Sequence, residues 1–133
     1  MLFEESLFAF LGAQPMMISI FADRIYPVSI PQGVEQEGPV CVYARTGTAS
    51  QDLLAAPGFT TIRMQFGFYG NRSDYLLLKT AADVLRKQIL TPLENIDDAK
   101  MVGLTWVNEA DTWEPTLQIP GVLSEYEFTI DET

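Results

Sequence analysis

The chain has 133 residues, of which 47% are hydrophobic and 20% charged, and its formal net charge is −10. This length predicts one domain over residues 1–133, with enough chain to bury a core without disulfides. The chain has no histidine and one cysteine, Cys41, which excludes imidazole-based catalysis, histidine-containing zinc sites and an internal disulfide. An acidic balance also argues against binding nucleic acid through its phosphates.

The first stretch of the chain predicts a helix over residues 2–13, with Phe3, Leu7, Phe10 and Leu11 on one face. The uncharged run from residue 6 to residue 22 is preceded by two glutamates and interrupted by polar residues. We therefore expect that it is neither a signal peptide nor a membrane span, that the protein does not associate with a membrane, and that its compartment is the cytoplasm.

Residues 16–39 are rich in proline and glycine, so we expect an irregular segment past Pro15, with one short strand at Ile25-Tyr26. A strand follows at Val40–Arg45, in which Cys41 is expected to be a small core residue. Residues 47–58 predict a loop or an irregular arm of a hairpin. Its apolar pair Leu53 and Leu54 either folds back on the sheet or packs on another subunit.

The clearest strand is Phe59–Tyr69, where apolar and polar side chains alternate with a period of two. The clearest helix spans residues 73–90. Its apolar stripe is wide enough to pack on a sheet and consists of Tyr75, Leu77, Leu78, Ala81, Ala82, Val84, Leu85 and Ile89.

The last third predicts a strand at Met101–Asn108, an acidic turn at Asn108–Pro115, and one or two strands over residues 117–130, broken at Pro120. Trp106 is expected in the core, and Trp113 is expected to be partly exposed and able to anchor an interface. The order of elements predicts an α+β fold: an antiparallel sheet of about four strands, with an N-terminal helix and a long amphipathic helix packed on it.

The sequence carries no glycine-rich phosphate loop, no cluster with zinc spacing and no serine nucleophile with a partner base. We therefore expect no catalytic residues, no metal and no cofactor. The many carboxylates leave one alternative open, a small carboxylate-dependent enzyme or ligand-binding module.

Three segments carry a resemblance to a known family. They are the stretch from Asp23 to Pro27, a Pro-Gln-Gly segment at residues 31–33, and the strand beginning at Pro39; Arg63-Met64-Gln65 and a long helix opening near Tyr75 follow. In this order the chain resembles the tail-completion or tail-terminator proteins of long-tailed bacteriophages and phage-like particles. The likeness covers about residues 1–90, and the last third fits more loosely.

The resemblance implies a non-enzymatic virion protein. Such proteins form a ring, often a hexamer, at the head-proximal end of the tail tube, where they end the tube and join it to the neck. The partners would then be other copies of the chain, the tail tube protein and a neck or head-completion protein, with assembly in the host cytoplasm. A head-side neck adaptor remains a second alternative.

The acidic residues are concentrated in the last third, where Lys100 alone stands against ten carboxylates. They form either a solvated face or a surface on which DNA must not stick. For a ring around DNA, we expect the channel to be lined or rimmed by part of one set: Glu94, Asp97, Asp98, Glu109, Asp111 and Glu114. The expected contacts with neighbouring subunits or partners are Leu53, Leu54 and Trp113.

Overall fold

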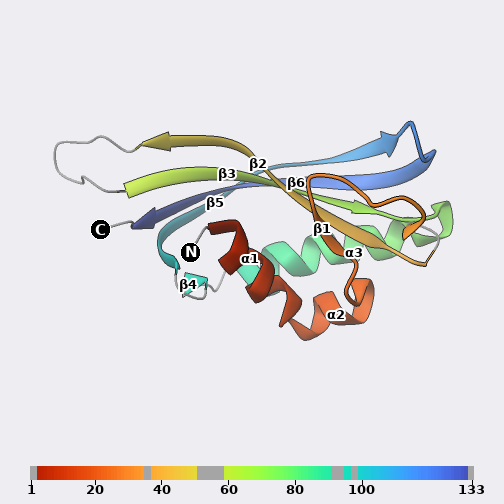
Figure 1. The fold of residues 1–133 in the computed structure, drawn as a ribbon, viewed down its shortest axis with the longest axis horizontal. Coiled ribbons are helices and arrows are strands. Elements are labelled where there is room, and N and C mark those ends of the chain that lie inside the picture. The colour runs from red at the N-terminus through yellow and green to blue at the C-terminus, as the bar shows by residue number, and fades with distance from the viewer. Residues whose placement is uncertain (1–2, 35–36, 51–58, 91–94, 97–98, 132–133) are drawn as a thin grey trace.

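The structure is a computed structural model that describes residues 3–34, 37–50, 59–90, 95–96 and 99–131. Its strands form a six-stranded sheet in the order β1-β2-β3-β6-β5-β4. The helices α1 (Phe3–Gly12), α2 (Pro15–Phe21) and α3 (Tyr75–Val84) lie against the same face of this sheet, and no described helix covers the other face (Figure 1). The predicted α+β fold is therefore confirmed.

The four long strands lie side by side and pair antiparallel: β2 (Val40–Ser50), β3 (Phe59–Tyr69), β6 (Ile119–Asp131) and β5 (Ala99–Glu114). All four predicted strands are thus present in one sheet. The expected short strand is β1 (Ile25–Pro27), which pairs parallel with β2. At the opposite edge, the two-residue β4 (Asn95–Ile96) pairs only with the first two residues of β5 and was not predicted.

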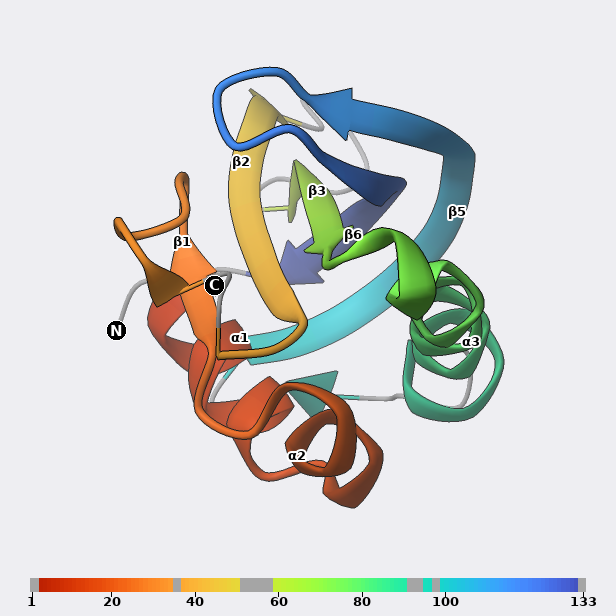
Figure 2. The ribbon, with the colours of Figure 1, turned by 90° about the vertical axis from the view of Figure 1, so that its right-hand side faces the viewer.

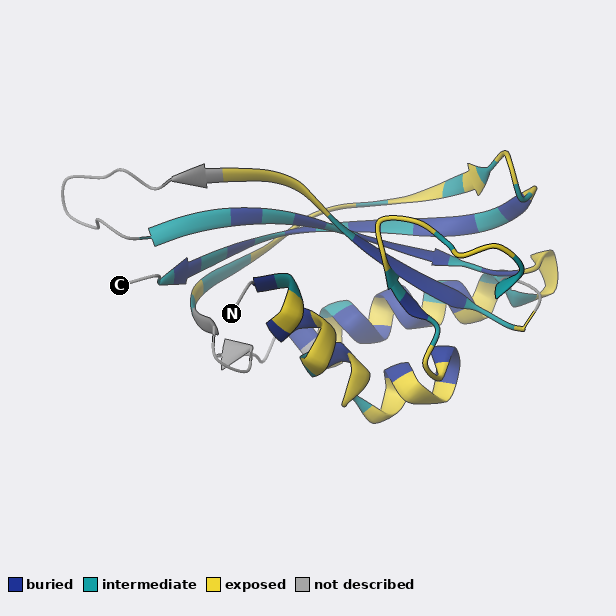
Figure 3. Ribbon diagram, viewed as in Figure 1, coloured by how far each residue is buried: buried dark blue, intermediate teal, exposed yellow. Residues whose placement is uncertain are grey.

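The core lies between the sheet and the helices, where the buried residues of both layers face one another (Figure 3). Aromatic rings join the two layers. Phe3 of α1 (Phe3–Gly12) meets Phe128 of β6 with ring centroids 5.1 Å apart. Phe21 of α2 stacks on Phe68 of β3 at 5.5 Å. Every second residue of β3 and β6 points into this core, because side chains of a strand alternate between its two faces.

The helix α2 (Pro15–Phe21) corrects the prediction of an irregular segment past Pro15. Proline fits the first turn of a helix, where its missing N–H group would have no partner. Met17, Ile20 and Phe21 are buried, and their spacing of three and four was the available signal. The segment of seven residues was too short to show clear periodicity.

The long helix is confirmed as α3 (Tyr75–Val84), which continues as a π-helical segment over Leu85–Leu90. Its stripe is buried at Leu78, Ala81, Ala82, Val84 and Leu85. Leu77 is 40% exposed, so the stripe is narrower than predicted. The side chain of Ile89 lies outside the described residues.

The last third contains longer strands than predicted. The segment expected as an acidic turn continues β5 to Glu114, and the chain turns only at residues 115–118. Likewise β6 runs unbroken through Pro120, and β2 extends to Ser50, into the segment expected as a loop or an irregular hairpin arm. Pairing with neighbouring strands overrides the weak strand propensity of Asp, Glu, Gly and Pro at these positions.

Candidate functional site

Charged and aromatic side chains interlock where α3 meets the outer strand β5. We call this surface the β5–α3 flank. On its β5 side lie Trp106, Glu109, Asp111 and Trp113; on its helix side lie Arg72, Tyr75, Lys79 and Arg86. Alternation along β5 turns these four strand residues toward α3, with a bulge between Trp106 and Asn108 that keeps Trp106 in phase with Glu109.

Lys79 lies at the centre of this flank, between Glu109 and Asp111. Its Nζ donates to Asp111 Oδ1 at 2.6 Å and lies 3.9 Å from Glu109 Oε2, while the Tyr75 hydroxyl donates to Asp111 Oδ2 at 2.6 Å. These hydrogen bonds, with that from Lys79 the stronger, hold the pKa of the Asp111 carboxyl below its ordinary value. The same contact raises the pKa of Lys79.

The lowered pKa of Asp111 does not suit the role of a general acid. A general acid among paired carboxylates needs a raised pKa, whereas the pKa of Asp111 is lowered. Among the described residues, no group of three or more Cys, Asp or Glu side chains could hold a metal ion. Cys41 is fully buried, as expected for a core residue, and burial raises the pKa of its thiol.

Both tryptophans lie on the flank as stacked, half-exposed rings. The Arg86 guanidinium lies 4.5 Å from the ring centroid of Trp106, and that of Arg72 lies 5.5 Å from the centroid of Trp113. Trp113 is 45% exposed, as the sequence indicated, but Trp106 is 44% exposed instead of buried in the core. The reason is that β5 lies near the sheet edge, where the helix layer covers it only in part (Figure 2).

The structure describes four of the predicted channel and interface residues, and all four lie on β5: Glu109, Asp111, Trp113 and Glu114. Glu109 and Asp111 lie in the cluster around Lys79, and Glu114 ends β5, where its carboxylate accepts a hydrogen bond from the Leu117 backbone N–H. Outside the described residues lie Glu94, Asp97, Asp98, Leu53 and Leu54. Sequence reasoning missed the cationic partners, because Lys79 and Asp111 are far apart along the chain.

The helix-free face of the sheet carries a second polar cluster. Arg63 of β3 pairs with Glu127 and lies near Glu125 on the neighbouring β6. Thr61 and Thr129 join their hydroxyls across the same two strands at 3.2 Å. At one end of this face, a hollow of about 310 Å³ lies between the segment 28–30, Tyr69 and the turn at residues 114–117.

The cluster around Lys79 predicts a pH-dependent contribution to stability. Asp111 has a lowered pKa in the folded chain, so its contribution is complete above its ordinary pKa of 3.8 and is lost as the pH falls through the lowered value. We expect Asp111→Asn to lower the melting temperature at pH 7 and this difference from wild type to shrink below pH 3.8. Thermal melts followed by circular dichroism from pH 7 down to the acid limit would measure it.

The matched control is Glu37→Gln, because Glu37 is exposed and makes no ion pair within the described part of the chain. Its melting temperature should follow that of the wild type at every pH. If Asp111→Asn also followed the wild type, the contact between Lys79 and Asp111 would contribute nothing to folding.

Hydrogen bonds near the start of β1 and β2 explain the local structure of the proline-rich segment. The Arg24 Nε donates to the Pro39 carbonyl at 2.8 Å, and the Cys41 backbone N–H donates to the Arg24 carbonyl at 2.9 Å. Gly38 adopts φ = 148°, and a Cβ there would lie 2.6 Å from the Arg24 guanidinium. Arg24 and Gly38 therefore fit together and fix where the chain enters β2.

No family model matches the sequence, and no curated protein matches it. Among solved structures, the fold is similar to that of a chain in the "Virion of native gene transfer agent (GTA) particle". The TM-score is 0.78 at 11% sequence identity, and the match covers 97% of this chain and 94% of that chain. Among the described helices, none has the length and apolar composition needed to cross a membrane.

Proposed function

We propose that the chain is a non-enzymatic structural protein of a virion, and that it forms a ring at the head-proximal end of a tail tube. One observation carries the virion role: the fold matches a chain of a gene transfer agent virion over nearly the full length of both. The non-enzymatic part of the proposal is supported by the Lys79 cluster, in which the lowered pKa of Asp111 does not suit a general acid.

The position at the tail end rests on the resemblance in residues 1–90. Its quoted segments occupy connected places in the fold. The stretch from Asp23 to Pro27 contains Arg24 and β1, the strand at Val40 is β2, and Arg63-Met64-Gln65 lies in β3 beside it. Tyr75 opens α3 and meets Asp111. The segments that carry the resemblance thus include the strands β1, β2 and β3, which form one side of the sheet.

The proposed ring consists of copies of this chain. We take six as the working number because the rings of the resembled family are often hexamers. A closed ring requires heterologous contacts, in which one patch meets a different patch on the next copy. We assign Leu53, Leu54 and Trp113 to such contacts or to contacts with the tail tube and neck proteins. Trp113 has the exposed, stacked aromatic character of an interface anchor.

DNA would pass through the ring without specific binding. Acidic side chains of adjacent copies would add, and at ~0.15 M salt their field would reach ~8 Å into the channel. Glu109 and Asp111 form ion pairs with Lys79, which offsets part of their negative charge. They would therefore repel DNA less than an unpaired carboxylate. The acidic lining would then depend more on Glu94, Asp97, Asp98 and Glu114.

Replacing Asp97 and Asp98 together with lysine should therefore leave particles assembled but slow the release of their DNA, most strongly at low salt. Release can be followed by the fluorescence of a DNA-binding dye after particles are triggered. The comparison variant is Asp111→Lys, which we expect to affect folding more than release. Normal release from the double variant at low salt would contradict an acidic channel at these residues.

The experiment that tests the function is deletion of the gene from the genome that produces the particles. We expect filled heads and separate tails, many of them too long, and rescue by the wild-type gene supplied separately. Tails of normal length beside heads that leak DNA would favour a head-side neck adaptor. Normal, fully joined particles would contradict a virion role. They would favour the alternative of a small carboxylate-dependent enzyme or ligand-binding module.

A further inference from the structure

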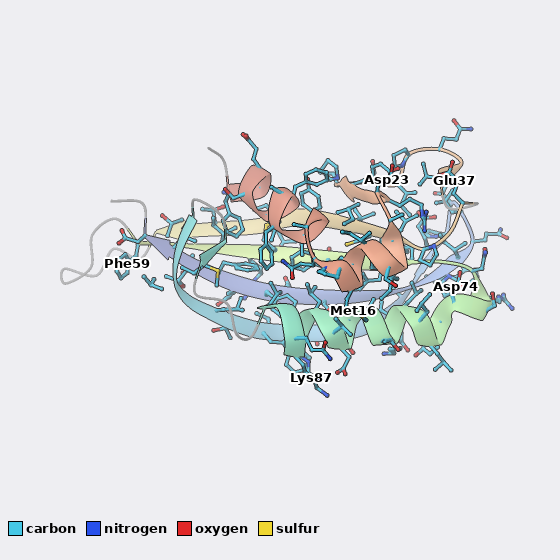
Figure 4. All side chains as sticks on the ribbon, turned by 90° about the horizontal axis from the view of Figure 1, so that it is seen from below. Met16, Asp23, Glu37, Phe59, Asp74 and Lys87 are labelled. Atoms are coloured by element: carbon cyan, nitrogen blue, oxygen red, sulfur yellow. The ribbon has the colours of Figure 1, made fainter. Side chains whose placement is uncertain are left out.

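A hollow of about 310 Å³ lies at one end of the helix-free face of the sheet. Its walls are the segment 28–30 and the turn at residues 114–117, and Tyr69, the last residue of β3, lies between them. Figure 4 labels Phe59, where β3 begins, and Asp74, which directly precedes α3, at opposite ends of the molecule, and the hollow is at the Asp74 end. Segments that are far apart in the sequence therefore build this one site.

The ring of Tyr69 lies flat on the sheet and forms the floor of the hollow. A glycine lies beneath each of its two edges, since a Cβ at Gly67 or at Gly121 would lie 2.6 Å from a carbon of the ring. Because these positions have no side chain, the ring approaches the backbone closely with one face and turns the other toward the hollow that it lines. The face of an aromatic ring carries partial negative charge, which attracts cations.

The carboxylate of Glu114 lies in one wall of the hollow. It accepts a hydrogen bond from the Leu117 backbone N–H across the turn, which holds it in place. Within the described part of the chain it makes no ion pair. Burial and, to a smaller extent, the negative charge of Glu114 raise the pKa of Tyr69, so the phenol beside this carboxylate is neutral at pH 7.

The opposite wall is apolar and is held in an unusual backbone conformation. Val28 has φ = 67°, a region that side chains branched at Cβ rarely adopt. Its backbone N–H donates to the Tyr43 carbonyl at 2.8 Å, which keeps it in this place. Its side chain lines the hollow and is 76% exposed. Strained positions of this kind are concentrated at binding sites, and here the strain presents an apolar wall across from the carboxylate.

The groups around the hollow select a cation with a flat head and an apolar stem. An apolar guest would cover the Glu114 carboxylate without giving it a partner, which costs free energy. An anion would be repelled by the same carboxylate. The guanidinium of arginine is planar, stacks on aromatic rings and pairs with carboxylates. Its methylene groups suit apolar walls such as Val28 and Ile30.

Charge complementarity indicates that this cation comes from another protein. The basic side chains that the structure describes are each engaged with a carboxylate, a backbone carbonyl or a tryptophan ring: Arg24, Arg45, Arg63, Arg72, Lys79, Arg86 and Lys87. The chain as a whole has a net charge of −10. A protein surface that complements it therefore carries exposed basic residues.

We propose that this hollow receives an arginine side chain of a neighbouring protein, with the guanidinium stacked on the Tyr69 ring and paired with the Glu114 carboxylate. The proposal goes beyond the ring and does not depend on it, because every group of the site lies on a single chain. In a ring, a Glu114 engaged in this way would rim the channel instead of lining its open wall.

The test titrates the isotopically labelled full chain with N-acetyl-arginine methylamide and follows the backbone amide signals by nuclear magnetic resonance. The control compound is N-acetyl-citrulline methylamide, which has the same shape without the positive charge. We expect the shifts to be confined to amides around the hollow, such as those of Ser29, Thr116 and Leu117. The arginine compound should bind about tenfold more tightly than the citrulline compound, because only a cation gains from the ring and the carboxylate.

A pair of matched variants tests which carboxylate is responsible. Glu114→Gln removes the charge but keeps an oxygen that can accept from the Leu117 N–H, so it should fold and bind arginine only as weakly as citrulline. Glu125→Gln removes a carboxylate from the same face of the sheet, outside the hollow, and should bind arginine as the wild type does. Unchanged signals away from the hollow would confirm that both variants are folded.

The partner is tested in assembled particles, with a photoreactive residue in place of the exposed Thr116. It should cross-link to a different protein beside an arginine of that protein, and Glu114→Gln should lower the yield several-fold. Equal binding of the two compounds, or unchanged binding by Glu114→Gln, would overturn the cationic site. Cross-links only to other copies of this chain would overturn the assignment of the partner. Particles that lack the chain would contradict the virion role instead, which the titration does not test.

Discussion

Replacing Phe128 with alanine should lower the free energy of unfolding by about 3–5 kcal/mol, the usual cost of removing a buried phenylalanine. Phe128 is fully buried in β6, where it contacts Phe3 of α1 and Tyr126 with ring centroids 5.1 Å and 6.3 Å away. The substitution leaves a cavity between the helix layer and the sheet and removes the aromatic contact with Phe3 of α1. Urea denaturation followed by circular dichroism would measure the change.

The control for this variant is Val102→Ala, on the adjacent strand β5. Val102 is 44% exposed, so its truncation should change the unfolding free energy by only about 0.5 kcal/mol or less. Equal and small effects of the two substitutions would contradict the packing of α1 on this part of the sheet.

The second large effect is expected at Gly121. The ring of Tyr69, its cross-strand partner, lies over this glycine: a Cβ at Gly121 would lie 2.6 Å from the ring and 3.1 Å from the Phe68 carbonyl oxygen. The same ring also lies over Gly67. Gly121→Val should therefore cost about 1–3 kcal/mol through overpacking, although valine favours strands.

Gly103 offers the matched comparison, because it is also a strand glycine but has its nearest neighbour, Thr129, at an ordinary 3.7 Å. Gly103→Val should be close to neutral in the same denaturation experiment. A Gly121→Val protein as stable as the wild type would mean that the Tyr69 ring moves aside at no cost.

Much of the fold could be predicted because the apolar and polar side chains of its long elements follow a regular period. The alternation in Phe59–Tyr69 and the stripe of the long helix follow directly from burial on one face. The second half of β5 could not be predicted in this way. Its Asn, Asp and Glu residues are weak strand formers, and only pairing with β6, a long-range effect, makes them a strand.

The candidate site was less accessible to sequence reasoning. Trp113 was expected to be exposed and is, whereas Trp106 was expected in the core. Its exposure depends on the strand order, which places β5 near an edge, and no local pattern encodes that order. The pairing of Asp111 with Lys79 and Tyr75 has the same origin, since it exists only when α3 packs beside β5.

The most direct test of the proposed role is a cryo-electron microscopy map of purified particles, with this chain fitted into the density at the junction of head and tail. The account predicts a closed ring of copies around the DNA path, at the head-proximal end of the tail tube. Absence of the chain from purified particles, or a place for it away from any ring, would contradict the account.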